Sequence, residues 1–205
     1  MKDKQQHIIE TALHLFAEKG FEGASVRDIA EKAGVNVAMV NYYFGSKDKL
    51  FEKIVEYKTS ITKGSLDEIQ KNKSLTSFQK IEAIIDSYIE RLFTNRKFHR
   101  LIQQEMILNQ REDLQTSIVN ILVQNAFIIK NIIDAGIKKG DFKKVDVELT
   151  IATLTGTINQ VLLSKKFCNT LMHKSDDYVP YDDWKFKKRV SLHLKQVMRN
   201  HLVND

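Results

Sequence analysis

The chain has 205 residues, a formal net charge of +6 at pH 7 and 42% hydrophobic residues. This is long enough for one or two compact domains with a substantial apolar core. One proline and eight glycines are few breakers for this length, and they favour long helices over many short strands. The single cysteine, Cys168, excludes an intramolecular disulfide framework and a CxxC metal site. Because no apolar signal core opens the chain and its apolar runs fall short of the roughly 18 residues of a membrane span, we expect a cytoplasmic protein.

Apolar residues recur at helical spacing along the N-terminal part of the chain. A first helix is expected at residues 4–19, and Gly20 then occupies the position of a left-handed C-terminal cap. Ser25, followed three residues later by Asp28, is a relative of the capping box and begins a short helix that ends near Lys32.

Asn36 is a favourable N-cap and predicts a second short helix, which ends near Phe44. A longer helix at 47–70 would link these short helices to the rest of the chain. Farther on, the periodicity predicts helices at residues 75–94, 97–109, 112–138, 146–170 and 183–202. We therefore expect an all-α protein of about nine helices. A three-helix domain at 1–50 would precede a larger helical domain at 51–205.

The stretch SVRDIAEKAGVNVAMVNYYFGSKDKL, residues 25–50, satisfies the geometric requirements of a helix-turn-helix. Ala30 is small where the second helix crosses the first. Gly34, four residues later, tolerates a positive φ in the turn. Val40 provides an apolar side chain that faces back to the first helix. A helix-turn-helix places its second helix in the major groove of DNA, so the spacing indicates a DNA-binding protein.

The same part of the chain resembles the TetR family, the tetracycline-repressor-like regulators. The resemblance covers roughly the first 55 residues, through LFAEKGFEGAS and VRDIAEKAGVNVAMVNYYFGSKDKLF. The matching residues are Gly20-Phe21, Ser25, Ile29-Ala30, Ala33-Gly34-Val35, Tyr42-Tyr43-Phe44, Ser46-Lys47-Asp48 and Leu50. The resemblance implies an all-α homodimer, with an N-terminal helix-turn-helix and a C-terminal helical domain for dimerisation and for binding an inducer.

Carried over to this chain, the recognition helix runs from Asn36 to Tyr43 and meets base edges and phosphates. The expected DNA-binding residues are Ser25, Arg27, Asn36, Val37, Ala38, Asn41, Tyr42, Tyr43 and Lys47. Many members have a tyrosine at the position of Asn41 and a histidine at that of Tyr43. We expect Tyr42 and Lys47 to make the leading phosphate contacts.

A structural interpretation stands beside the functional one for several of these residues. Phe44 is expected to pack in the core, and Tyr43 could either pack in the core or contact DNA. Residues 1–50 carry seven basic and seven acidic side chains, so their charge alone would equally suit a helical small-molecule-binding protein whose helix-turn-helix does not bind DNA. The stretch 32–47 contains no acidic residue, which favours DNA binding.

The C-terminal part offers apolar residues that could line a ligand pocket or simply form a helical core. These candidates are Ile84, Ile85, Tyr88, Leu92, Phe93, Met106, Phe127, Ile128 and Phe167. The resemblance implies that the helices at 146–170 and 183–202 form a four-helix bundle between two subunits. A small apolar effector would then make the protein a ligand-responsive repressor of a near-palindromic operator.

Catalytic and metal sites find no support in the sequence. The six histidines are scattered, with no HExxH pair, and no nucleophile motif or glycine-rich phosphate loop occurs. Cys168 lies in an apolar stretch and is expected to be a small buried hydrophobe. We therefore expect a protein that is not an enzyme and holds no metal or cofactor.

Overall fold

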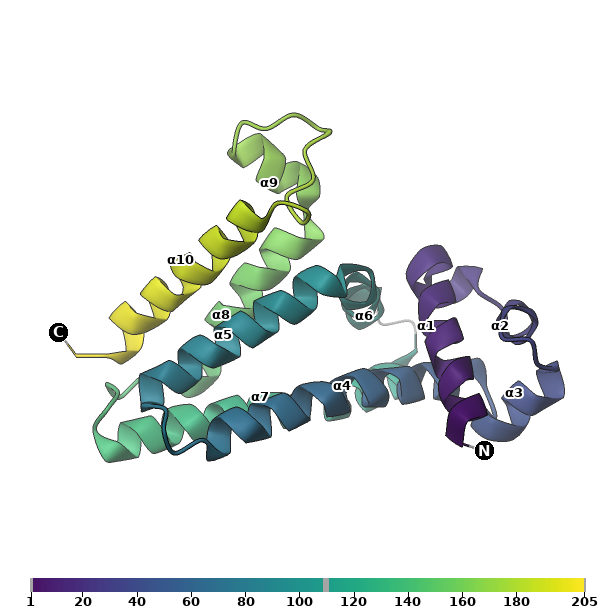
Figure 1. Cartoon of the computed structure of the whole chain (residues 1–205), viewed down its shortest axis with the longest axis horizontal. Helices are drawn as coiled ribbons and strands as arrows, with labels where there is room; N and C mark the ends of the chain where they lie inside the picture. Colours follow the sequence, from purple (N-terminus) through teal and green to yellow (C-terminus); the bar gives the residue numbers. More distant parts are fainter. Residues whose placement is uncertain (1, 109–110, 205) are drawn as a thin grey trace. The chain divides into compact units, whose positions relative to one another are not determined.

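A computed structural model describes residues 2–108 and 111–204 (Figure 1). These residues form helices and no strand, which confirms the predicted all-α fold. In chain order the helices are α1 (Lys2–Gly23), α2 (Val26–Lys32), α3 (Val37–Phe44), α4 (Lys47–Lys71), α5 (Ser77–Thr94), α6 (Arg96–Leu108), α7 (Glu112–Lys139), α8 (Val147–Leu163), α9 (Lys165–Leu171) and α10 (Trp184–Leu202).

The described residues form ten helices rather than the expected nine, because the predicted helix at 146–170 is two helices. Ser164 leaves the helical conformation at φ −122° and ψ 77°, and it separates α8 from α9. Apolar residues continue on both sides of Ser164, so the periodicity shows no interruption there. The expected end of another helix, at residue 109, lies outside the described residues.

The chain divides into two compact units. The first takes in the chain up to Thr62 together with Lys97–Val123, and the second takes in Lys63–Arg96 together with the chain from Gln124 onward. The expected domain at 1–50 therefore lies within the first unit, which also contains most of α6 and the first part of α7. Both α4 and α7 contribute residues to both units.

The first unit is built around an aromatic cluster. The Phe16 and Phe21 rings stack at 5.3 Å between centroids, and Phe51 packs edge-on against each of them at 5.5 and 5.2 Å. Gly20, at φ 77° and ψ 171°, breaks the helical path of α1 just before Phe21. An L-residue with a side chain rarely adopts a positive φ, so this glycine allows Phe21 to turn into the core. The core thus ties the end of α1 to α4.

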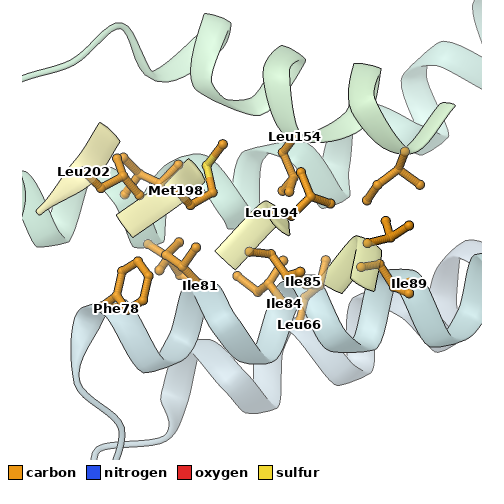
Figure 2. Packing of buried hydrophobic residues seen from close by; sticks show 14 of the residues in the cluster. Leu66, Phe78, Ile81, Ile84, Ile85, Ile89, Leu154, Leu194, Met198 and Leu202 are labelled. Carbon is orange, nitrogen blue, oxygen red and sulfur yellow. The ribbon is translucent and has the colours of Figure 1, made fainter. Parts of the chain in front are cut away.

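The second unit packs α10 against α5 and α8 (Figure 1). Figure 2 shows their apolar side chains meeting in one layer, with Ile85, Leu194 and Leu154 near its middle. At the edge of this layer Asp86 accepts hydrogen bonds from Ser191 Oγ at 2.7 Å and from Lys195 Nζ at 2.5 Å.

By length and composition alone, α7 is apolar enough to cross a membrane. Its buried side chains, however, belong to the two protein cores: Leu114 and Ile118 to the first and Ile128 and Ile132 to the second. A single helix of this kind is weak support for a membrane protein.

Candidate DNA-binding interface

The first helix of the motif, α2, begins at a complete capping box. Ser25 Oγ accepts a hydrogen bond from the Asp28 amide at 3.1 Å, and the Ser25 amide donates to Asp28 Oδ2 at 2.8 Å. The pKa of the Asp28 carboxyl is lowered because Ser25 Oγ, at 2.5 Å, and the Ser25 amide both donate hydrogen bonds to it, and Lys19 Nζ at 3.5 Å adds to the effect. The Ser25 side chain is thus occupied in starting the helix, while Arg27 projects into solvent.

The turn between α2 and α3 closes with two backbone hydrogen bonds. The Val35 amide donates to the Ala30 carbonyl at 2.9 Å, and the Gly34 amide donates to the Glu31 carbonyl at 3.1 Å. Gly34 has φ 64°, so this is a Schellman ending. Ala30 and Val40 are both buried at the helix crossing. The structure therefore confirms the geometry predicted for Ala30, Gly34 and Val40.

The second helix, α3, begins at Asn36 and separates clearly into two faces. Asn36 Oδ1 accepts a hydrogen bond from the Met39 amide at 2.7 Å, which caps the helix. Val40 and Phe44 face inward and are buried. The exposed positions on the other side are Val37, Ala38, Asn41 and Tyr42. A short helix whose inner face is fixed in a core can present its outer face to the major groove.

The three aromatic residues near the end of α3 have different surroundings. Tyr42 is 79% exposed, so its phenol is available to a partner. Tyr43 is half-buried and packs against the apolar core, with its ring 5.5 Å from that of Tyr42 and 6.2 Å from that of Phe44. Tyr43 is therefore at least in part a packing residue, and Phe44 is a core residue, as expected.

Lys47 is the first residue of α4 and is already engaged within the protein. Its Nζ lies 4.3 Å from the centroid of the Phe21 ring and 4.0 Å from Glu22 Oε2. The distance to Glu22 is an ion-pair distance but too long for a hydrogen bond. The side chain, 21% exposed, is thus loosely held beside the start of α4, where helix amides favour an anion.

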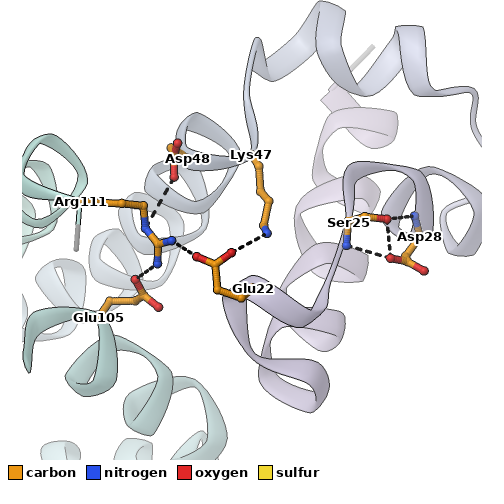
Figure 3. A network of polar contacts seen from close by, with 7 residues as sticks. All are labelled: Glu22, Ser25, Asp28, Lys47, Asp48, Glu105 and Arg111. Carbon is orange, nitrogen blue, oxygen red and sulfur yellow. Dashed lines mark hydrogen bonds and ion pairs between the residues drawn. The ribbon is translucent and has the colours of Figure 1, made fainter. Parts of the chain in front are cut away.

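Arg111, immediately before α7, is a functional candidate that the sequence did not reveal (Figure 3). Its guanidinium donates hydrogen bonds to Glu22 and to Glu105, and its Nε lies 4.0 Å from Asp48 Oδ1. It also lies over Phe21, 4.1 Å from the ring centroid. The hydrogen bond from Arg111 lowers the pKa of the Glu22 carboxyl. Residues 22, 48, 105 and 111 are widely separated in the chain, so no local pattern could have grouped them.

The expected ligand-pocket residues are only partly brought together. Five of them belong to the core of the second unit, Ile84, Ile85, Leu92, Phe93 and Ile128, and Tyr88 packs against that core. Burial raises the pKa of the Tyr88 phenol. Met106 packs instead at the edge of the core of the first unit, while Phe127 and Phe167 are exposed.

The described part of the chain contains no group of three or more His, Cys, Asp or Glu side chains that could hold a metal ion. Cys168 is buried, and its Sγ lies 3.7 Å from the Val161 carbonyl oxygen. Burial raises the pKa of this thiol, which suits the predicted role of a small packing residue.

Known proteins share both halves of this architecture. The family described as "Bacterial regulatory proteins, tetR family" matches residues 8–54, and "Tetracyclin repressor-like, C-terminal domain" matches residues 74–163. The Bacillus subtilis (strain 168) protein named "Probable HTH-type transcriptional regulator YttP" is 28% identical over 203 residues, covering 97% of this chain and 94% of its own. The HTH-type transcriptional repressor KstR2 of Rhodococcus jostii (strain RHA1) is 26% identical over 158 residues, covering 75% and 76%.

Among solved structures, the transcriptional regulator FadR from Bacillus subtilis in complex with stearoyl-CoA has the same fold. Its TM-score is 0.73 at 23% identity, and the match covers 92% of this chain and 96% of FadR. Residues 8–54, which match the tetR family, include the capping box, the Schellman turn and the two-faced helix α3 described above. The chain therefore belongs to the TetR family of bacterial regulatory proteins and is a DNA-binding transcriptional regulator.

Proposed function

We propose that the protein is a ligand-responsive repressor that binds a near-palindromic operator as a homodimer. The observation that carries the proposal is the outer face of α3, where Tyr42, 79% exposed, stands beside exposed Asn41, Val37 and Ala38. The name of the relative KstR2 supports repression as the response.

On this proposal, residues 1–50 supply the DNA contacts. Val37 and Ala38 contact thymine methyl groups, and Asn41 pairs with an adenine edge or a phosphate. Tyr42 and Lys47 bind phosphates and set the position of α3 in the groove. Ser25, Arg27, Asn36 and Tyr43 contribute at the margin, with Ser25 and Asn36 acting through the helix ends that they cap.

Dimerisation is assigned to the outward faces of α8 and α10. Leu149 on α8 and Leu192 on α10 are both more than half exposed, and Ala152 and Gly156 leave room on α8 for a second helix to approach. Thr150 Oγ1 lies 2.9 Å from His201 Nε2 and joins the two helices. Pairing of these faces from two subunits forms a four-helix bundle. The two copies of α3 would then lie about 34–36 Å apart, one turn of DNA.

The effector is proposed to be a small molecule with an apolar or acyl-chain part, bound among helices of the second unit. Ile84, Ile85 and Phe93 supply an apolar environment there, and the related FadR was solved with stearoyl-CoA. Such a ligand regulates the protein only if it binds the two conformations with different affinity, typically by about 1–3 kcal/mol. Residues 51–205 thus carry effector binding and dimerisation, in a cytoplasmic protein with no catalytic role.

Selection of genomic DNA fragments with the purified protein tests this proposal. A recurrent near-palindrome is expected, and its affinity should fall steeply with salt because phosphate contacts release counterions. Tyr42→Ala should weaken DNA binding strongly at unchanged Tm. The control Ile61→Ala, which also truncates an exposed apolar side chain of the first unit, should leave DNA binding unchanged. No enrichment by folded, dimeric protein freed of bound ligand would instead favour a small-molecule-binding protein that does not bind DNA.

A further inference from the structure

The charged cluster around Arg111 adjoins the proposed phosphate contact Lys47, and it contains more carboxylates than cations. Arg111 and Lys47 face Glu22, Glu105 and Asp48 (Figure 3), so the cluster has a net charge of −1. Without Arg111 the net charge would be −2. An excess of negative charge beside a phosphate contact opposes DNA binding, since charges within about 10 Å interact even at 0.1 M salt.

Glu22 is the residue that the two cations share. One carboxylate oxygen accepts a hydrogen bond from Arg111 Nη1, and the other lies 4.0 Å from Lys47 Nζ. Because Arg111 holds this carboxylate, Lys47 is attracted to it but not hydrogen-bonded. A carboxylate released by Arg111 is free to turn toward Lys47 and bind it directly.

Arg111 is itself held from the other side. Glu105 on α6, whose side chain is only 9% exposed, accepts a hydrogen bond from Arg111 Nη2. The position of the guanidinium therefore depends on where α6 and the start of α7 lie. Since α7 continues from the first unit into the second, a displacement of α7 is a direct way to move Arg111.

We propose that Arg111 controls DNA affinity as a positioning residue, by keeping Glu22 from capturing Lys47. With Arg111 in place, Lys47 keeps only a long ion pair with Glu22 and can exchange it for a phosphate. When α6 and α7 shift, Glu22 loses its partner and binds Lys47, and one phosphate contact is lost. This inference rests on the proposed function, and it identifies the contact through which an effector lowers DNA affinity.

Operator titrations of four proteins test the proposal, with Glu18→Gln as the matched control. Glu18 is also an exposed carboxylate of α1, 3.6 Å from Lys32. Glu22→Gln should tighten binding by about two- to five-fold, the range spanned by exposed ion pairs, and by more than Glu18→Gln does. Arg111→Gln should weaken binding and make the log–log salt slope less negative by about 0.9, one phosphate contact. The double variant Glu22→Gln/Arg111→Gln should bind at least as tightly as the wild type.

Lys47→Met identifies the site of action. In that background Glu22→Gln and Arg111→Gln should change operator affinity no more than Glu18→Gln does. If Arg111 contacted DNA itself, Arg111→Gln would weaken binding in both backgrounds, and Glu22→Gln would not rescue the affinity. This result would overturn the proposal. Arg111→Gln leaves Glu105 without its partner and could fail to fold for that reason. In that case the double variant Glu105→Gln/Arg111→Gln, which removes both charges, takes the place of Arg111→Gln in every comparison.

Acylation of lysines measured by peptide mass spectrometry tests the same exchange without DNA. Lys47 should react several-fold more slowly in Arg111→Gln than in the wild type, and the double variant with Glu22→Gln should restore its rate. Lys53, whose only ion pair in the described chain is with Glu56 on the same helix, is the internal reference. If Lys47 reacted equally fast in Arg111→Gln and in the wild type, the proposed transfer of Glu22 from Arg111 to Lys47 would be refuted, even if the protein binds its operator. If the wild-type protein bound no operator, the proposed function would be refuted. The acylation rate of Lys47 would still show whether Glu22 moves from Arg111 to Lys47.

Discussion

Gly136 on α7 is a position where a single methyl group should destabilise the protein. A Cβ built there lies 2.3, 2.5 and 3.0 Å from the Cδ2, Cε2 and Cγ atoms of Phe142, well inside ordinary contact distance. The Phe142 ring is buried. Its backbone amide donates to the Gly136 carbonyl at 3.2 Å. The backbone of Phe142 is thus held by the turn that follows α7, and its ring can make room only by rotating against the side chains that bury it.

The magnitude of this effect follows from two opposing contributions. Overpacking a core costs about 1–3 kcal/mol, and the upper end applies because the added Cβ overlaps a buried ring. Alanine gains about 0.8–1.0 kcal/mol over glycine inside a helix. Gly136→Ala should therefore lower the free energy of unfolding by about 2 kcal/mol, which corresponds to a fall in Tm of about 4–8 °C for a chain of this size.

Thermal unfolding at one fixed protein concentration measures this effect, because the proposed dimerisation would make Tm depend on concentration. Gly64→Ala on α4 is the matched control. No atom lies within 4 Å of a Cβ added at Gly64, so the same substitution should raise Tm by about 2–4 °C. A Gly136→Ala protein as stable as the wild type would show that the close approach of Phe142 does not limit this position.

Three further predictions concern the helix start, the dimer and a tyrosine. Ser25→Ala removes the capping box of α2 and should lower Tm at pH 7 by about 1–8 °C. Because the Asp28 pKa is lowered in the folded protein, the capping box stabilises fully above the ordinary carboxyl pKa, and the deficit of Ser25→Ala should shrink as the pH falls below it; a constant deficit would contradict this. Leu149→Glu should shift sedimentation from dimer to monomer and abolish tight operator binding, whereas Ile61→Glu, an equally non-conservative change at an exposed residue of the first unit, should leave the dimer intact. Tyr178 Oη donates to Asp183 Oδ2 at 2.6 Å, which raises the pKa of Tyr178 from 10.0 to about 12; the ultraviolet titration of the wild type minus that of Tyr178→Phe should show this shift, and Asp183→Asn should reduce it.

Local signals made the DNA-binding helices predictable. Ser25 and Asn36 cap helices through hydrogen bonds that span three residues, and Gly34 adopts the positive φ of the turn. Each of these features depends on residues within one helical turn, which is the range over which a sequence pattern carries information. The assignment of Val40 to the buried face also followed from helical spacing alone.

Features that depend on distant residues were not predictable. The break at Ser164 interrupts a continuous apolar pattern, and the Ser164 side chain makes no cap hydrogen bond to mark the start of α9. Phe127 and Phe167 are apolar but exposed, because periodicity identifies an apolar face without identifying what covers it. The hydrogen bonds of Arg111 join residues up to 89 positions apart, and nothing in the local sequence distinguishes this arginine from an ordinary surface residue.

The spacing of half-sites tests the central claim most directly. The affinity of the wild-type protein should be measured for its selected operator and for the same operator with five base pairs inserted between the half-sites. If a dimer places two copies of α3 in successive major grooves, the insertion turns one half-site to the opposite side of the DNA and should reduce the affinity by on the order of 100-fold or more. Equal affinity for the two DNAs would contradict binding through paired recognition helices.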